Sequence, residues 1–134
     1  MSRHVQGAFD VKLGPQPADE RELGAAIARL TLDKRFHGAL DARSEGQMLA
    51  FRSGVEGSAG YVAMERVEGS LDGRVGGFVL QHSGTMDRGA KQLDLHVVPD
   101  SGSGQLVGLR GSMAIDITGG AHFYRFDYTL PGSE

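Results

Sequence analysis

Hydrophobic and polar residues alternate along most of this chain, as in β-strands that bury one face. The clearest alternation runs from Tyr61 to Glu68 and from Val75 to Ser83. The Asp72-Gly73 pair between these stretches suits a tight hairpin, because both residue types tolerate positive φ. Pairing across such a turn predicts that one inner face carries Tyr61, Ala63, Glu65, Val67, Gly76, Phe78, Leu80 and His82. A one-residue bulge would reverse that face.

The same alternation predicts six further strands. They cover Val5–Leu13, Ile27–Arg43, Met48–Ser53, Gln92–Val98, Met113–Thr118 and His122–Leu130. Gly38 is interpreted as a bulge or bend inside its strand. The run Ser44-Glu45-Gly46-Gln47 is interpreted as a turn. Pairing across that turn predicts an apolar face made of Leu40, Ala42, Leu49 and Phe51.

About eight strands separated by turn signals, with no convincing helix, predict an all-β fold. The chain of 134 residues is expected to form a single β-barrel domain over 1–134. Its 21 glycines lie mostly at turns, which favours β structure. A closed antiparallel barrel is preferred to a sandwich because closure removes exposed edges. The expected core includes Phe78, Leu80, Leu95, Ile115 and Phe126.

An internal repeat supports the barrel. The run from Gly69 to Leu80 and the run from Gly104 to Ile115 both read G-x-L-x-G-x-x-G-x-Φ-x-Φ, where Φ is apolar. Gly73 and Gly108 occupy matching places in it, so positive φ or close backbone contact is expected at both. A phosphate-binding reading would need a helix after the glycines, and none is predicted.

This repeat resembles the glycine-punctuated turn of allene oxide cyclases and dirigent proteins. Further segments resemble a family of small bacterial proteins of unassigned function, over nearly the whole chain. They are Asp33–Gly38, Gly57–Val67, Gln81–Gly89, Val97–Gly104 and Phe126–Leu130. The resemblance implies an allene-oxide-cyclase-like, calycin-like barrel. The cyclases' inward glutamate corresponds by position to Glu65, whereas their active-site cysteine has no counterpart here.

Glu65 and His82 are the candidate catalytic residues. An inward carboxylate must be paired, protonated or hydrogen-bonded, and His82 is expected opposite or diagonal to it on the neighbouring strand. The pair can act as a general acid and base, or it can be a structural network held by a buried arginine or by Tyr61. Ring-bearing side chains are the candidate ligand-binding residues: Tyr61, Phe78, Tyr124, Phe126, Tyr128 and His122.

Composition narrows the partners. The net charge of −3 and pI near 5.9 disfavour nucleic acid or an anionic membrane as a partner. The chain has no cysteine and no histidine pair at metal-ligand spacing, so neither a metal nor a cofactor is expected. The first residues lack the apolar run of a signal peptide, which predicts a cytoplasmic protein.

Three functional classes remain open. The first is a protein that binds a small apolar molecule inside the barrel, and it is ranked first. The second is a cofactor-free isomerase or cyclase that uses the Glu65–His82 pair. The third is a homo-oligomeric interaction module with a filled barrel. Barrels of about eight strands lie near the size at which side chains just fill the interior, so the fold does not decide between them.

Overall fold

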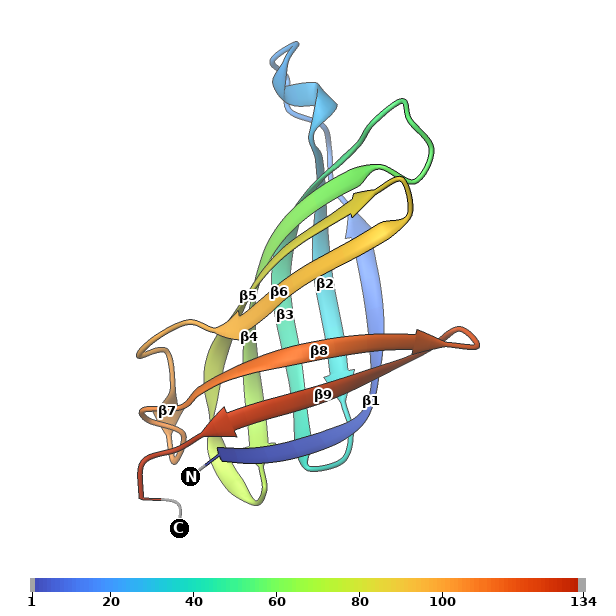
Figure 1. Ribbon diagram of the computed structural model, residues 1–134. Helices are drawn as coiled ribbons and strands as arrows, with labels where there is room; N and C mark the ends of the chain where they lie inside the picture. The colour runs from blue at the N-terminus through green and yellow to red at the C-terminus, as the bar shows by residue number, and fades with distance from the viewer. Residues whose placement is uncertain (1, 133–134) are drawn as a thin grey trace.

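Eight antiparallel strands form a closed barrel, and a short ninth strand is added to it, in the computed structural model, which describes residues 2–132 (Figure 1). The strands are β1 Ser2–Pro15, β2 Ala28–Phe36, β3 Leu40–Arg52, β4 Ala59–Leu71, β5 Arg74–Asp87, β6 Ala90–Val97, β7 Ser103–Gly104, β8 Arg110–Thr118 and β9 Ala121–Thr129. The pairing of β4 with β5 closes the ring, and the two-residue β7 pairs with β5. The predicted all-β barrel is confirmed.

The β4–β5 hairpin forms as predicted. Asp72 and Gly73 make its turn, with φ values of 49° and 82°. Glu65 pairs with Leu80, and Ala63 pairs with His82. Odd positions of β4 and even positions of β5 therefore face the interior without an intervening bulge, and both Glu65 and His82 are buried.

The predicted turn at Ser44-Glu45-Gly46-Gln47 is wrong, because β3 runs straight through it. The chain turns earlier, between β2 and β3, where Gly38 has a φ of 98°. Leu40 and Ala42 are buried, whereas Leu49 and Phe51 lie on the exposed face, so the predicted apolar face does not exist. Gly46 serves close packing instead: a Cβ there would lie 2.7 Å from the Glu65 Cα.

The half of the barrel that contains the β4–β5 turn is a packed core. Phe78, Leu80, Leu95 and Phe126 are buried together as predicted, and Ile115 is partly buried against them. The Phe78 and Phe126 rings stack with their centroids 5.9 Å apart. Leucines of the loop between β6 and β8 are also part of this core, namely Leu106 and Leu109. We call this part the base of the barrel.

The opposite end of the barrel is splayed. Within residues 2–132, β6 and β8 pair at His96 and Ser112 alone. Figure 1 shows β8 and β9 crossing the direction of β5 and β6, so that the upper part of β6 and the far end of β8 diverge. The short 3₁₀ helix Gly24–Ala26 lies between β1 and β2. Within residues 2–132, no helix is long and apolar enough to span a membrane.

Candidate functional site

Glu65 is the centre of a buried polar cluster inside the barrel. It faces inward from β4, opposite Gly46, and is 1% exposed. Its Oε2 lies 2.8 Å from the Lys34 Nζ and 2.9 Å from the His82 Nε2. Its Oε1 accepts a hydrogen bond from the Ser44 Oγ at 3.3 Å. The expected pairing with His82 is thus present, and the buried cation is a lysine where an arginine was expected.

Lys34, like Ser44, is a member of this site that the sequence did not predict. It comes from β2, where it lies on the same inward face as the buried Leu32 and Phe36, and is 8% exposed. Its Nζ lies 5.2 Å from the centre of the Phe9 ring and 5.8 Å from that of Phe36. These aromatic faces stabilise a cation that has little water around it. The alternation of β2 was the available signal, because it places Lys34 inward.

These contacts keep the Glu65 carboxylate ionised. Burial raises the pKa of Glu65, but the hydrogen bond from His82 and the positive charge of Lys34 outweigh burial and lower this pKa below its usual value. Among the described residues, no buried side-chain nitrogen or oxygen lacks a hydrogen-bond partner. The buried charges are therefore compensated within the site.

Tyr61 connects this site to the open end of the barrel. Its ring lies across Gly84, where an added Cβ would be 2.4 Å from the Tyr61 Cε1. Its hydroxyl is 3.3 Å from the Nδ1 of His82. Burial raises the pKa of Tyr61, and the negative charge of Glu65 adds to this, so the hydroxyl stays protonated. We call Lys34, Ser44, Tyr61, Glu65 and His82 the Glu65 cluster.

Apolar residues on the inner face are left accessible at the splayed end. Leu13, which lies on the same face of β1 as Phe9 and Val11, is 47% exposed, and Leu93 is 38% exposed. Leu93 pairs with Gly84, which in turn pairs with Tyr61, so it lies in the same row as Tyr61 around the barrel. We define the mouth as the inward-facing residues Leu13, Leu30, Met48, Tyr61, Met86 and Leu93, all partly or largely exposed.

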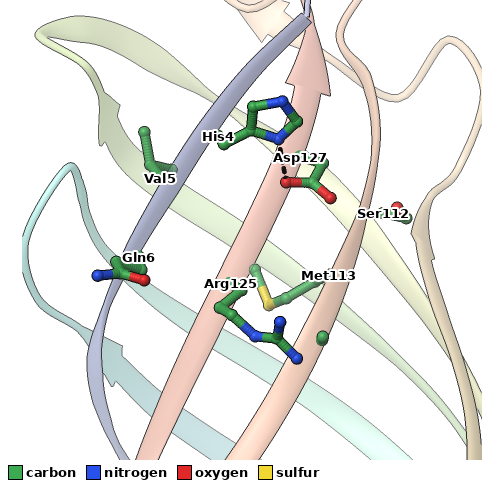
Figure 2. A pocket seen from close by; sticks show the side chains of 8 residues that line it. His4, Val5, Gln6, Ser112, Met113, Arg125 and Asp127 are labelled. Carbon is green, nitrogen blue, oxygen red and sulfur yellow. Dashed lines mark hydrogen bonds and ion pairs between the residues drawn. The ribbon is translucent and has the colours of Figure 1, made fainter.

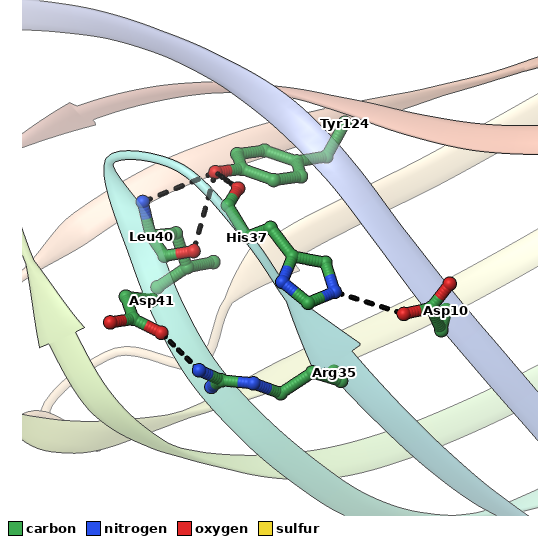
Figure 3. Close-up of polar contacts among 6 residues, drawn as sticks. All are labelled: Asp10, Arg35, His37, Leu40, Asp41 and Tyr124. Carbon is green, nitrogen blue, oxygen red and sulfur yellow. Dashed lines mark hydrogen bonds and ion pairs between the residues drawn. The ribbon is translucent and has the colours of Figure 1, made fainter.

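Four of the predicted ligand-binding residues lie in the base. Phe78, Tyr124, Phe126 and Tyr128 are at most 2% exposed. The Tyr124 hydroxyl donates to the His37 carbonyl at 2.7 Å and accepts from the Leu40 N–H at 3.1 Å (Figure 3). That of Tyr128 bonds to the Asp72 carboxylate. These hydroxyl groups join strands and turns of the base, and the packed core lies between them and the mouth.

His122, the remaining predicted ligand-binding residue, is half-buried on β9. It pairs with Phe9, and the two rings lie 5.3 Å apart. Because Phe9 also covers Lys34, His122 is separated from the Glu65 cluster by that ring. The structure thus brings Tyr61, Glu65 and His82 together and leaves His122 on the other side of Phe9.

Two of the hollows that residues 2–132 form lie on the outer surface. One, of about 240 Å³, lies across β1, β9 and β8, where His4 contacts Asp127 and Arg125 lies near Met113 (Figure 2). The other, of about 570 Å³, lies across β2 to β5 between two rows of outward-facing side chains. Its exposed apolar members are Leu49, Val62 and Met64. Between these two rows runs the row Leu30, Met48, Ala63 and His82, which also lines the hollow although its side chains face inward. We call it the outer hollow, because the side chains of the two flanking rows point away from the barrel interior.

Comparison with known proteins identifies the family. The sequence profile of DUF3224, described as proteins of unknown function, matches residues 5–128. The chain belongs to the DUF3224 family. A crystal structure of a DUF3224 protein of unknown function from Shewanella oneidensis MR-1 is 50% identical, with a TM-score of 0.92 over 99% of this chain and 100% of that one. Comparison with curated proteins finds no match.

The DUF3224 structure from Shewanella shares this fold, and neither match describes an activity. Of the features of this chain, the Glu65 cluster is the candidate functional site, since it places three ionisable side chains below an accessible apolar surface. Such a combination of burial and perturbed ionisation is characteristic of functional sites.

Proposed function

We propose that this DUF3224 protein binds a small, mostly apolar molecule at the mouth of the barrel. The observation that supports this most strongly is the exposure of inward-facing apolar side chains directly beside Tyr61. In a filled barrel these positions would be covered, as they are in the base. Each 100 Å² of apolar surface that a ligand covers here contributes roughly 2.5 kcal/mol.

The Glu65 cluster gives this apolar surface a polar end. Most binding sites for small molecules combine apolar walls with a few fixed polar groups that orient the ligand. Tyr61 meets that description, because its hydroxyl is held by His82 and its ring is part of the mouth. Lys34 and Glu65 are too buried to contact a ligand directly, so their role is to fix His82.

Fluorine NMR with para-fluorotoluene as the probe tests the proposal. Leu93→Asp places a charge in the row of Tyr61, while Val62→Asp places the same charge in the outer hollow. We expect Leu93→Asp to weaken binding roughly tenfold, which corresponds to about 1.4 kcal/mol. Val62→Asp is expected to change it less than about twofold. Equal loss in both variants, loss in Val62→Asp alone, or no binding to the wild type would contradict the proposal.

A second function, cofactor-free proton transfer, is favoured by the continuous chain from Glu65 through His82 to Tyr61. A substrate proton would pass to the Tyr61 oxygen while the Tyr61 proton passes to the His82 Nδ1. Glu65 would stabilise the resulting imidazolium. The resemblance to allene oxide cyclases, which have an inward glutamate, supports an isomerase or cyclase of this kind.

Deuterium incorporation into the methyl ketone group of para-methylacetophenone in heavy water measures this activity. We expect exchange with the wild type and none above background with Glu65→Gln, although that variant still binds para-fluorotoluene. Exchange at the same rate in both proteins would remove the chain from the mechanism.

A further inference from the structure

The hydrogen-bond directions within the Glu65 cluster determine which polar group the mouth can accept. The carboxylate of Glu65 is ionised, so both of its oxygens can only accept hydrogen bonds. Oε2 receives one from Lys34 at 2.8 Å and one from His82 at 2.9 Å. A neutral His82 must therefore carry its proton on Nε2, an assignment that follows from its partners.

This tautomer makes the other ring nitrogen an acceptor. Nδ1 of a neutral imidazole with its proton on Nε2 has a lone pair and no proton. The group near it is the Tyr61 hydroxyl, at 3.3 Å, which donates its single proton to Nδ1. The Tyr61 oxygen then has no proton left for a ligand and presents only lone pairs to the mouth.

We infer that the ligand carries a hydroxyl group, as a phenol or an alcohol does, and donates it to the Tyr61 oxygen at the mouth of the barrel. This inference rests on the proposed binding function and specifies its ligand class. The chain of donors then runs in one direction, from the ligand through Tyr61 and His82 to Glu65, and every member is satisfied.

Ligands that can only accept hydrogen bonds fit less well. A ketone needs the Tyr61 proton, so binding it would take that proton from His82. Nδ1 of His82 would be left without a partner in a residue that is 3% exposed. An unpaired buried acceptor is unfavourable, so the site discriminates against ketones, ethers and esters of the same shape. A fully apolar analogue loses the bond to Tyr61 but leaves the chain intact.

Three probes of similar size separate these cases. para-Cresol donates a hydroxyl, para-fluorotoluene has no comparable polar group, and para-methylacetophenone only accepts. Their dissociation constants are to be measured by NMR titration at about pH 8.5, where free imidazole is neutral. We expect para-cresol to bind roughly fivefold to tenfold more tightly than either of the others, as one hydrogen bond of ordinary strength provides.

Tyr61→Phe removes the oxygen and keeps the ring, so it should bring the three dissociation constants to within about twofold. Tyr124→Phe removes a hydroxyl from the base, where the Tyr124 oxygen bonds to the β2–β3 turn, and should keep the preference for para-cresol. A preference for the ketone, or a preference for para-cresol that survives Tyr61→Phe, would overturn the inference.

The outcomes also separate the inference from the function on which it rests. If all three probes bind the wild type with similar affinity, binding at the mouth stands and the hydroxyl specificity is wrong. If none of them binds, both are wrong.

Discussion

Replacing Glu65 by glutamine tests whether the cluster is a compensated set of buried charges. The glutamine keeps the shape of the side chain and removes its charge, which leaves Lys34 buried without a counter-ion. The side chains of Lys34 and Glu65 are 5% and 0% exposed, so water cannot replace the lost partner. Breaking a buried ion pair in this way costs about 3–5 kcal/mol.

A loss of that size is large for a protein of this length. Single domains have unfolding free energies of roughly 5–15 kcal/mol, and the loss corresponds to a drop in Tm of roughly 10–20 °C. Urea denaturation followed by circular dichroism measures it directly. Glu68→Gln is the matched control, since Glu68 lies on the same strand and pairs with Arg66 at 3.0 Å on the exposed face. We expect the control to lose less than about 1 kcal/mol.

The double variant Lys34→Met with Glu65→Gln completes the test. Removing both charges relieves the unpaired lysine, so the double variant should be more stable than Glu65→Gln alone. If Glu65→Gln is no less stable than Glu68→Gln, or if Lys34→Met lowers the stability of Glu65→Gln further, the buried charge pair is not what holds this site together.

Low pH should remove the stability that the ionised Glu65 carboxylate contributes. Because the pKa of Glu65 is lowered in the folded protein, its ionisation stabilises the fold at all pH values above the ordinary range of a glutamate. That stability is lost as the pH falls through the lowered pKa. The difference in unfolding free energy between wild type and Glu65→Gln should therefore be constant near neutrality and shrink below about pH 4.

Two further predictions concern the base of the barrel. Gly73→Val is expected to lower the unfolding free energy by about 1–3 kcal/mol, because φ at Gly73 is 82°. An added Cβ would meet nothing within 4 Å there, so the loss would come from backbone strain alone. Gly54→Val, also in open space but without a positive φ, is the control in thermal unfolding, and equal losses in both variants would refute the reasoning. Burial and the Asp72 carboxylate raise the pKa of Tyr128 to about 12. At about pH 11, where exposed tyrosines are ionised, the Tyr128 phenol should therefore remain protonated, as an absorbance titration of wild type and Tyr128→Phe would show. Because this pKa is raised in the folded protein, the stability that the Tyr128 phenol contributes is present below about pH 10 and is lost at higher pH. Ionisation of Tyr128 at the pH of an exposed tyrosine would contradict this prediction.

The inner face of β4 and β5 could be predicted from sequence because two signals agreed. Alternation defined each strand, and the Asp72-Gly73 turn defined how they pair, which placed Glu65 and His82 on one face. The positive φ of Gly73 and Gly108, 82° and 84°, likewise follows from their matching places in the repeat.

The other half of the site could not be predicted in the same way, because local turn chemistry was misleading in β3. Gly46 follows Ser44 and Glu45 and looks like part of a turn, yet it is a strand residue that leaves room for Glu65. Because of this error, Leu49 and Phe51 were assigned to the inner face, and Ser44 was assigned to a turn and not to the site. Lys34 was missed for a different reason: a lysine at an inward position needs a partner, and that partner lies on a strand distant in sequence.

The most direct test of the central claim, that ligands bind at the mouth beside the Glu65 cluster, is the NMR spectrum of the methionine methyl groups during titration with para-cresol. Met86 belongs to the mouth alone, and Met48 belongs to the mouth but also lines the outer hollow. Met64 faces only the outer hollow, and Met113 is buried in the base. We predict that the Met48 and Met86 signals shift with one common dissociation constant while those of Met64 and Met113 stay in place. A shift confined to Met64 would place the ligand on the outside of the barrel and contradict the account.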